Sequence, residues 1–377
     1  MNFFRFRLIR PLCCLIILFS VTACSLPPRV MAQDRMFLDL SLEFIDSYEL
    51  PQTSFEDTIV GGLSAIAYDQ VTDLFYVLSD DRSERGAARY YTMKLDLQEL
   101  PNNEISIDNV TVEKVIFLKD QNGNLFAPGT IDPEGLALSP RGTVFISSEG
   151  APELNVNPFV AEFDLATGQQ RSIVPISPRY FPENNQGIRK NLAFESLTIK
   201  PVGLPQDPFR LFTAIESSLI QDQSEEENAR IRFLHYVINP IGNPIVVAEH
   251  LYLLEPDEPE TISNGLTELL TLDQEGYFLS LERTFGFLGA GAKIFQVVAG
   301  NASDTYTIDS LKDISSIQPM SKQLLLDLKD LGIYLDNLEG MTLGPRLPDG
   351  SNSLILVSDN NFSEDQVTQF LLFRLNQ

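Results

Sequence analysis

The chain has 377 residues, 44% of them hydrophobic and 21% charged, a composition that can bury a large core and is not typical of disorder. Its 52 Asp and Glu outnumber 27 Lys and Arg, which gives a formal net charge of −25 at pH 7. Such a surface repels nucleic acids and anionic lipid. The composition therefore argues against a nucleic-acid-binding protein and favours a positive ion as partner.

The N-terminal segment has the pattern of a secretory signal peptide over residues 1–23. Arg5, Arg7 and Arg10 form a basic region, and an apolar run that ends in small residues follows it. The apolar run is too short for a membrane span. We therefore expect an exported protein.

Two cleavage sites are open at the end of this segment. Val21 to Cys24 is similar to the lipobox of bacterial lipoproteins, in which the cysteine becomes the lipid-modified first residue. This predicts lipidation of Cys24, a linker over residues 24–35 and a membrane anchor facing the periplasm or the cell exterior. The alternative is Val30 to Ala32, where cleavage after residue 32 would give a soluble periplasmic or secreted product.

The three cysteines, Cys13, Cys14 and Cys24, all lie in or at the end of this segment. Residues 36–377 therefore contain no thiol. This excludes disulfides, thiolate metal sites and a cysteine nucleophile from the mature domain.

Five segments share one pattern: a polar or acidic residue, an alternating apolar strand, a turn, a denser apolar strand, and a final acidic residue. Their spacing of about 60 to 75 residues suits four strands with loops. β-Branched and aromatic residues are enriched, and only residues 310–331 contain a pattern suited to a short helix. The copies start near Gly62, Asp132, Asn191, Asn264 and Asp336.

The repeats predict an all-β protein with one β-propeller domain over residues 36–377. The repeat count gives five blades, with six as the alternative if one blade has lost its motif. The fifth copy is one strand short, and a candidate strand from Met36 precedes the first copy. Pairing of these N-terminal and C-terminal strands would close the ring and leave no open edge. A pair of β-sandwich domains is the other architecture that the strands allow.

Carboxylates recur at two places in each copy. A hairpin places the opening of its first strand beside the end of its second, so an innermost first strand would bring both places to one mouth of the central channel. The opening set consists of Glu134, Glu195, Glu268 and Glu339, with Ser64 in the first copy. The closing set consists of Asp80, Asp81, Glu149, Glu216, Glu282, Asp359 and Asn360.

These carboxylates have two interpretations. Any single one can cap backbone N–H groups at a strand end. Several in one mouth would repel each other unless a cation intervenes, and Ca²⁺ suits an all-oxygen ligand set, whereas zinc would recruit His or Cys. His235 and His250 fall on expected outer strands and are interpreted as structural. The predicted calcium ligands are Asp81, Glu134, Glu149, Glu195, Glu339 and Asp359.

Arg82 and Arg283 each follow a closing carboxylate, and can pair with that carboxylate or bind an anion. Together with Glu134 and Glu195 they are the predicted catalytic residues. The sequence has no Gly-x-Ser-x-Gly elbow and no nucleotide-binding glycine loop.

The repeats resemble the phytase-like domain family, often labelled "esterase-like activity of phytase", from about Leu40 onward. The resemblance implies a secreted or periplasmic β-propeller related in architecture to calcium-dependent propeller phytases. The dense mixture of Lys, Arg and Asp expected for a phytate site is not found, so a simpler phosphate ester or a lactone is no less expected as the substrate. The motifs that carry the resemblance are GGLSAIAYD with LFYVLSDDR, DPEGLAL with ISSEG, AFESLTI with TAIES, LTELLTLDQEGYFLSLER, and DNLEGMTLGP with LILVSDNN.

Two functions remain open at this point. The first is a monomeric, metal-assisted hydrolase that cleaves a small-molecule ester at the channel mouth. The second is a non-catalytic scaffold whose mouth holds Ca²⁺ or a ligand, because a fold does not define a function.

Overall fold

The computed structural model describes residues 36–101, 104–183, 185–224, 228–257, 260–287 and 289–377. The chain divides into two units, residues 1–38 and 39–377, and every strand belongs to the second unit. The predicted signal peptide (1–23), Cys24 and the linker (24–35) lie outside the described residues and stay predictions. Among the described residues, none of the helices has the length and apolar character needed to cross a membrane.

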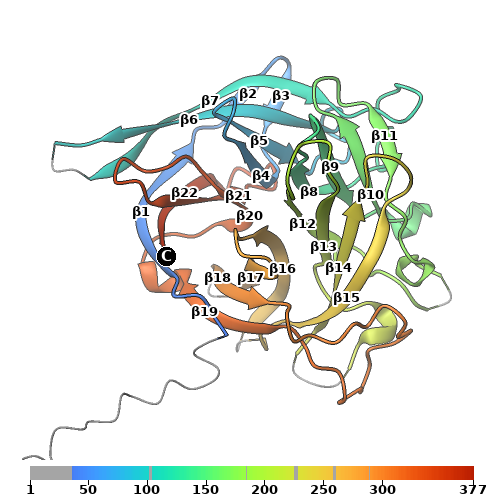
Figure 1. The fold of residues 1–377 in the computed structure, drawn as a ribbon. Helices are drawn as coiled ribbons and strands as arrows, with labels where there is room; N and C mark the ends of the chain where they lie inside the picture. Colours follow the sequence, from blue (N-terminus) through green and yellow to red (C-terminus); the bar gives the residue numbers. More distant parts are fainter. Residues whose placement is uncertain (1–35, 102–103, 184, 225–227, 258–259, 288) are drawn as a thin grey trace, which may run out of the picture. The chain divides into compact units, whose positions relative to one another are not determined.

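Five four-stranded antiparallel sheets surround a common centre in the second unit (Figure 1). Blade 1 contains β4 (Leu63–Asp69), β5 (Leu74–Ser79), β6 (Arg89–Glu99) and β7 (Ile105–Phe117). Blade 2 contains β8 (Pro133–Leu138), β9 (Thr143–Ser148), β10 (Phe159–Asp164) and β11 (Gln170–Ile173). Blade 3 contains β12 (Phe194–Lys200), β13 (Phe209–Ile215), β14 (Arg230–Ile238) and β15 (Ile245–Leu253).

Blades 4 and 5 complete the set. Blade 4 contains β16 (Thr261–Thr271), β17 (Tyr277–Gly286), β18 (Gly289–Val298) and β19 (Ser321–Asp327). Blade 5 contains β20 (Asn337–Leu343), β21 (Asn352–Asp359), β22 (Thr368–Asn376) and β1 (Ser41–Leu50). A small hairpin joins β2 (Thr53–Phe55) to β3 (Thr58–Val60). The described 3₁₀ helices are η2 (Pro152–Leu154), η3 (Pro178–Tyr180), η4 (Ile220–Asp222) and η5 (Leu328–Leu331).

The first strand of each repeat is innermost, and the five innermost strands contact one another in sequence around the centre: β4 with β8, β8 with β12, β12 with β16, β16 with β20, and β20 with β4. The chain therefore forms a propeller with five blades, as the repeat count predicts, and neither six blades nor a pair of sandwiches.

Blade 5 is built from both ends of the described chain. β1 pairs antiparallel with β22, from Ser41 opposite Asn376 to Leu50 opposite Thr368. The candidate strand from Met36 thus lies at the outer edge of the blade whose repeat is one strand short, which is the place that the sequence predicts.

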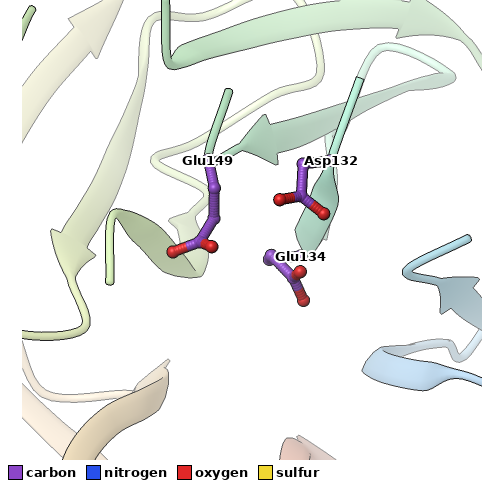
Figure 2. A group of neighbouring side chains, drawn as sticks. All are labelled: Asp132, Glu134 and Glu149. Carbon is purple, nitrogen blue, oxygen red and sulfur yellow. The ribbon is translucent and has the colours of Figure 1, made fainter. Parts of the chain in front are cut away.

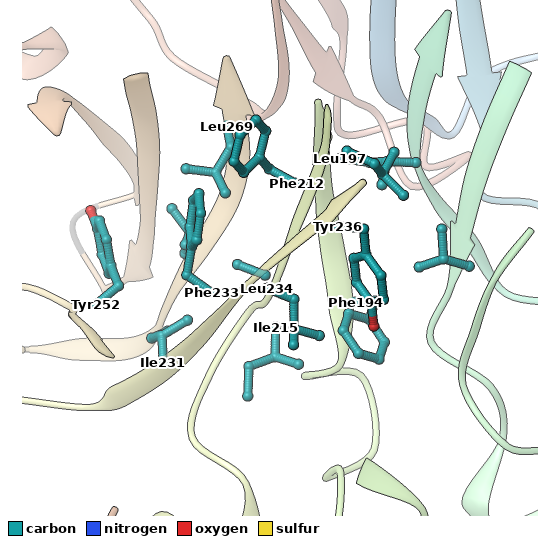
Figure 3. Packing of buried hydrophobic residues seen from close by; sticks show 14 of the residues in the cluster. Phe194, Leu197, Phe212, Ile215, Ile231, Phe233, Leu234, Tyr236, Tyr252 and Leu269 are labelled. Carbon is teal, nitrogen blue, oxygen red and sulfur yellow. The ribbon is translucent and has the colours of Figure 1, made fainter. Parts of the chain in front are cut away.

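The core lies between the blades, because each sheet packs on its two neighbours and both of its faces are apolar. β13 shows this pattern: every residue from Leu211 to Ile215 is buried, with no alternation. Between blades 3 and 4, Phe278 packs edge-on against Phe212 and Phe233, with ring centroids 4.9 and 5.1 Å apart. Figure 3 shows the surrounding side chains of this cluster between the sheets. This packing supports the innermost strands that carry the site.

The helix expected within residues 310–331 is reduced to the single 3₁₀ turn η5. Its N-cap Asp327 accepts the N–H of Lys329, and Gly332 ends the turn with φ of +64°. The rest of that segment is irregular up to β19.

Candidate functional site

Every innermost strand contains a β-bulge near its beginning. In four blades the bulge lies one or two residues after the strand begins, and in blade 4 it lies six residues after, because that strand starts earlier. At each bulge the pairing with the second strand skips a residue. A bulge breaks the alternation of the strand and turns the extra side chain out of the pleat. The residues at the five bulges are Ser64, Glu134 with Gly135, Glu195, Thr267 and Glu339.

The position of the bulge in blade 4 shows that Glu268, predicted as a member of the opening set, does not belong to it. In blade 4 the skipped residue is Thr267, whereas Glu268 pairs opposite Leu281. The carboxylate of Glu268 accepts the backbone N–H groups of Leu197 and Leu269, at 3.2 and 2.8 Å. Glu268 therefore joins blade 4 to blade 3 and does not line the mouth, because a shift of one residue along a strand turns the side chain to the other face.

A second set of side chains lies where the second strand of each blade ends. The N–H groups of Asp80, Glu149 and Glu216 donate to the carbonyl groups just before the innermost strands, at 2.8, 3.0 and 2.6 Å. In blade 5 the corresponding residue is Asp359, opposite Asn337. In blade 4 it is Arg283, opposite Gly265. One arginine thus occupies the place that a carboxylate has in the other four blades.

Glu282, predicted as the closing residue of blade 4, is one residue away from this set. Its carboxylate accepts the hydroxyl of Tyr252, the ammonium of Lys322 and the N–H of Glu255. It therefore belongs to the packing of blade 4 against blade 3, and not to the mouth.

Asp81 is also absent from the mouth, which corrects its predicted role as a calcium ligand. Arg89 Nη1 donates to Asp81 Oδ2 at 2.8 Å in a fully buried ion pair, and Asp81 Oδ1 accepts the N–H groups of Glu84 and Arg85. Its oxygens are occupied on the far side of the strand end. The neighbouring Asp80 faces the mouth, and its buried Oδ1 has no hydrogen-bond partner in the described part of the chain.

The glutamates at the bulges and the second set of side chains line one cavity of about 980 Å³, whereas Ser64 and Thr267 are not part of its lining. All four predicted catalytic residues line it, as do the predicted ligands other than Asp81. Two triads of carboxylates have oxygens within 4.8 Å of one another: Asp132, Glu134 and Glu149, and Glu149, Glu195 and Glu216. Figure 2 shows the first triad at the ends of neighbouring strands. Nine carboxylates line the cavity: Asp80, Glu134, Glu149, Glu195, Glu216, Glu339 and Asp359 from the strand ends, together with Asp336 and Asp365.

Burial and mutual repulsion raise the pKa values of these carboxylates. Burial is the largest cause, and for Glu134 and Glu195 the negative charges of the neighbouring carboxylates add to it. The pKa of Glu339 rises to about 8, and those of Asp132 and Asp359 to about 6. Without a further cation, ionisation of these carboxylates at neutral pH therefore destabilises the folded chain.

Both arginines of the cavity are in ion pairs. Arg82 Nε donates to Asp132 Oδ1 at 2.7 Å. Arg283 donates through Nη2 to Glu216 Oε1 at 2.9 Å and through Nη1 to Asn337 Oδ1 at 2.7 Å. Two cations are thus shared among many more carboxylates. Although burial alone would lower the pKa of Arg283, the nearby carboxylates raise it, so this side chain stays charged.

Gly265 makes the pair between Arg283 and Glu216 possible. A β-carbon at position 265 would lie 2.0 Å from Glu216 Oε1, so any larger residue would displace this carboxylate. The glycine is required for a close approach and not for its backbone conformation.

The donor set of the mouth fits a calcium ion. Glu195 is 9% exposed, and its carboxylate accepts no hydrogen bond in the part of the chain that the structure describes. The strand-cap interpretation does apply to Glu149, which accepts the N–H of Ala193 with one oxygen. The remaining donors are carboxylate and amide oxygens, the ligands that calcium prefers.

The two histidines lie outside this site, as expected. His235 is on β14 and stacks on Phe212 at 4.5 Å between centroids, and burial lowers its pKa to about 4. His250 is on β15, where Nδ1 lies 3.0 Å from the carbonyl oxygen of Ser303. Among the described residues, neither histidine lines the cavity.

The fold and the site define a five-bladed β-propeller whose blades bring carboxylates together in one cavity. The chain belongs to the phytase-like family, described as "Esterase-like activity of phytase", which matches residues 58–362. This confirms the resemblance seen in the repeats. A comparison with curated proteins finds no match.

Solved structures with related shapes include several sugar-cleaving enzymes. The catalytic domain of Coprinopsis cinerea GH62 alpha-L-arabinofuranosidase has 8% identity and a TM-score of 0.42, with 89% of this chain and 97% of that chain covered. Bacillus subtilis arabinanase Arb43A has 16% identity and a TM-score of 0.40, with 83% of this chain and 94% of that chain covered. Bombyx mori GH32 beta-fructofuranosidase has 12% identity and a TM-score of 0.37, with 83% of this chain covered. Only 60% of that chain is covered, which is less than two thirds of its length. At these TM-scores the similarities carry no argument about activity.

Proposed function

We propose that the protein is a calcium-dependent hydrolase that cleaves a phosphate ester or another ester in the cavity at the centre of the propeller. The observation that carries this proposal is the group of seven carboxylates from the strand ends, six of them buried and Asp80 partly so, around two arginines that are already paired. Such an arrangement is more stable at neutral pH when a further positive charge joins it. A multivalent cation with oxygen ligands meets that need.

The residues that would hold the cation are those of the two triads, with Glu149 common to both. Glu339, Asp359 and Asp80 line the same cavity and would complete the set. When bound, Ca²⁺ would supply a Lewis acid that polarises the ester and promotes ionisation of a water molecule.

The chain's own side chains would orient the substrate and move the proton. Arg283 and Arg82 would hold an anionic oxygen of the ester, since a guanidinium suits phosphate and carboxylate groups. The carboxylate of Glu195, which has no hydrogen bond to the described chain, would accept a proton from the attacking water. The water oxygen forms the new bond to phosphorus or the acyl carbon, the bond to the alcohol oxygen breaks, and the alcohol leaves with a proton from Glu195.

Export of the protein and its attachment to a membrane through Cys24 are part of this proposal. They rest on the sequence of residues 1–24. The proposal treats the protein as a monomer, because one chain forms all five blades and the whole cavity.

A non-catalytic calcium-binding or ligand-binding scaffold is the second candidate. The observation that favours it is that Arg82 and Arg283 are both engaged by the protein's own carboxylates. A scaffold of this kind would bind Ca²⁺ and turn over no ester.

Turnover of a panel of phosphomonoesters and carboxylic esters, with Ca²⁺ or with a chelator, separates the two candidates. The hydrolase predicts turnover that requires Ca²⁺ and falls by about two orders of magnitude in Glu195→Gln. Glu268→Gln is the matched control, because Glu268 is also a buried glutamate and lies outside this cavity. Calcium binding without turnover of any ester in the panel would support the scaffold.

A further inference from the structure

The cavity has two chemically different sides. Among the described residues, blades 1 to 3 contribute only polar and charged side chains to its lining, such as Asp80, Glu149 and Glu216. The apolar lining residues come from blade 4 and from the segment just before β20. Phe285 and Tyr334 are the largest of them, and they are 46% and 59% exposed.

The apolar side exists because blade 4 extends beyond the mouth. β4, β8 and β12 begin one residue before the bulge, whereas β16 begins at Thr261, six residues before Thr267. The additional length is roughly 15 Å at the usual rise of a strand. β17 and β18 continue alongside, up to the pair of Gly286 with Gly289. The hairpin therefore forms a wall above the acidic floor.

Arg283 and Phe285 lie on the same face of this wall. They are two residues apart in β17, with unbroken pairing to both neighbouring strands, so their side chains are roughly 7 Å apart along the strand. Their partners on that face are small: Gly265 and Ala292 flank Arg283, and Ser263 and Ala290 flank Phe285. No large neighbour on the sheet covers the phenyl ring or separates it from the guanidinium.

Tyr334 provides a second aromatic ring on this side of the cavity. Its hydroxyl donates to Asp336 Oδ2 at 3.2 Å, which orients the ring. Asp336 is itself held by the side chain of Gln366 and the N–H of Val367. A ring with an anchored hydroxyl presents its apolar faces at little cost in conformational entropy.

We propose that the ligand of this cavity is amphipathic: an anionic or ester head lies at Arg283 and the carboxylate floor, and an apolar or aryl group packs against Phe285 and Tyr334. This rests on the proposed function in that the same cavity receives the substrate. It assigns the substrate class, esters with a hydrocarbon or aromatic group next to the ester bond, and makes Phe285 a specificity-determining residue.

The separation of charge and hydrocarbon along β17 supports this class over a purely polar one. A highly charged ligand such as a polyphosphorylated sugar would leave both exposed aromatic rings in water, and the cations that the described lining offers it are the two paired arginines and Lys329. A phenyl or alkyl group would remove apolar surface of Phe285 from water, which is favourable in proportion to the area buried.

The test is calorimetric titration of the full-length, calcium-loaded protein with two non-hydrolysable probes, phenylphosphonate and methylphosphonate. Wild-type protein is expected to bind phenylphosphonate about tenfold more tightly, since burial of part of a ring contributes on the order of 1.4 kcal/mol. Phe285→Ser should remove this preference and leave the affinity for methylphosphonate unchanged. Phe287→Ser, at an 81% exposed aromatic outside the cavity lining, should keep the preference.

Equal binding of the two probes by wild-type protein, binding of neither, or an unchanged preference in Phe285→Ser would overturn the inference. The calcium-dependent hydrolase would survive that result if esters of small and large alcohols were cleaved at similar rates. Conversely, a preference that depends on Phe285 in a protein that cleaves no ester would keep the inference and refute the hydrolase.

Discussion

Arg283 Nη2 lies 2.9 Å from Glu216 Oε1, and this ion pair joins the ends of the second strands of blades 4 and 3. Arg283 also reaches Asn337 at the start of β20 in blade 5. A single guanidinium therefore connects three of the five blades at the mouth, where every corresponding residue is acidic.

Replacement of Arg283 by Gln should destabilise the calcium-free protein by about 3 kcal/mol, because it leaves buried carboxylates without their cation. Urea unfolding with a chelator present measures this loss. Arg283→Lys should lose less stability, since the positive charge remains, although an ammonium group cannot make both guanidinium contacts. A glutamine variant as stable as wild type would show that the pair contributes nothing to the mouth.

Calcium should stabilise the folded chain. Binding to the native state alone adds about 2.7 kcal/mol at a hundredfold excess of free Ca²⁺ over its Kd. Glu134→Gln and Glu195→Gln should each reduce this gain, because they remove a ligand charge and keep the shape. Thermal unfolding with and without Ca²⁺ measures the effect, with Glu268→Gln as the control. If wild type gains nothing from Ca²⁺, the carboxylates are strand caps.

The calcium-free protein should become more stable as the pH falls from about 8.5 to about 6.5. The pKa of Glu339 is raised to about 8 in the folded state. Its protonation therefore contributes to the free energy of unfolding, fully below the usual pKa of a glutamate, and this contribution is lost as the pH rises through about 8. The pKa values of Asp132 and Asp359 are also raised, to about 6, so protonation of these two carboxylates stabilises the folded state in the same direction. Urea midpoints across this range check the trend. Saturating Ca²⁺ should remove it, since a bound cation keeps the carboxylates ionised.

Below about pH 6.5 an opposite contribution from His235 begins. Its pKa is lowered to about 4 by burial, so protonation favours the unfolded chain. The pH comparison is therefore made above that range.

Deletion of residues 36–50 should cost solubility and cooperative unfolding. The deletion removes β1 and exposes the edge of β22 over its whole length. A shorter deletion of residues 36–40, which ends before β1, is the matched control. Melting curves and the soluble fraction after expression decide the matter, and a fully cooperative transition at the wild-type temperature would contradict the role of β1.

Cys24→Ser should release the protein from membranes, because the thiol of Cys24 is the expected lipid attachment point. Fractionation of cells that express each form measures this. Mass spectrometry of the wild-type protein should find a lipid-modified N-terminus at Cys24. An unmodified N-terminus at Gln33 would instead establish cleavage after residue 32.

The sequence by itself determined the blades, because each repeat encodes its strands and turns locally. It also predicted the partner of β22 and the convergence of carboxylates, since a hairpin brings the opening of one strand beside the end of the next. Glu134, Glu195 and Glu339 could be found in this way.

Only the tertiary structure decided which of two adjacent residues faces the mouth, Asp80 and not Asp81, Arg283 and not Glu282, and that the bulge of blade 4 falls at Thr267 and not at Glu268. Side chains alternate along a strand, and a bulge inserts one residue into that alternation, so the face of a side chain depends on where the pairing skips. The pairing is set by contacts between strands, and so is the wall of blade 4. Phe285 looks in sequence like any core aromatic, and it is exposed because β16 to β18 extend past the neighbouring blades.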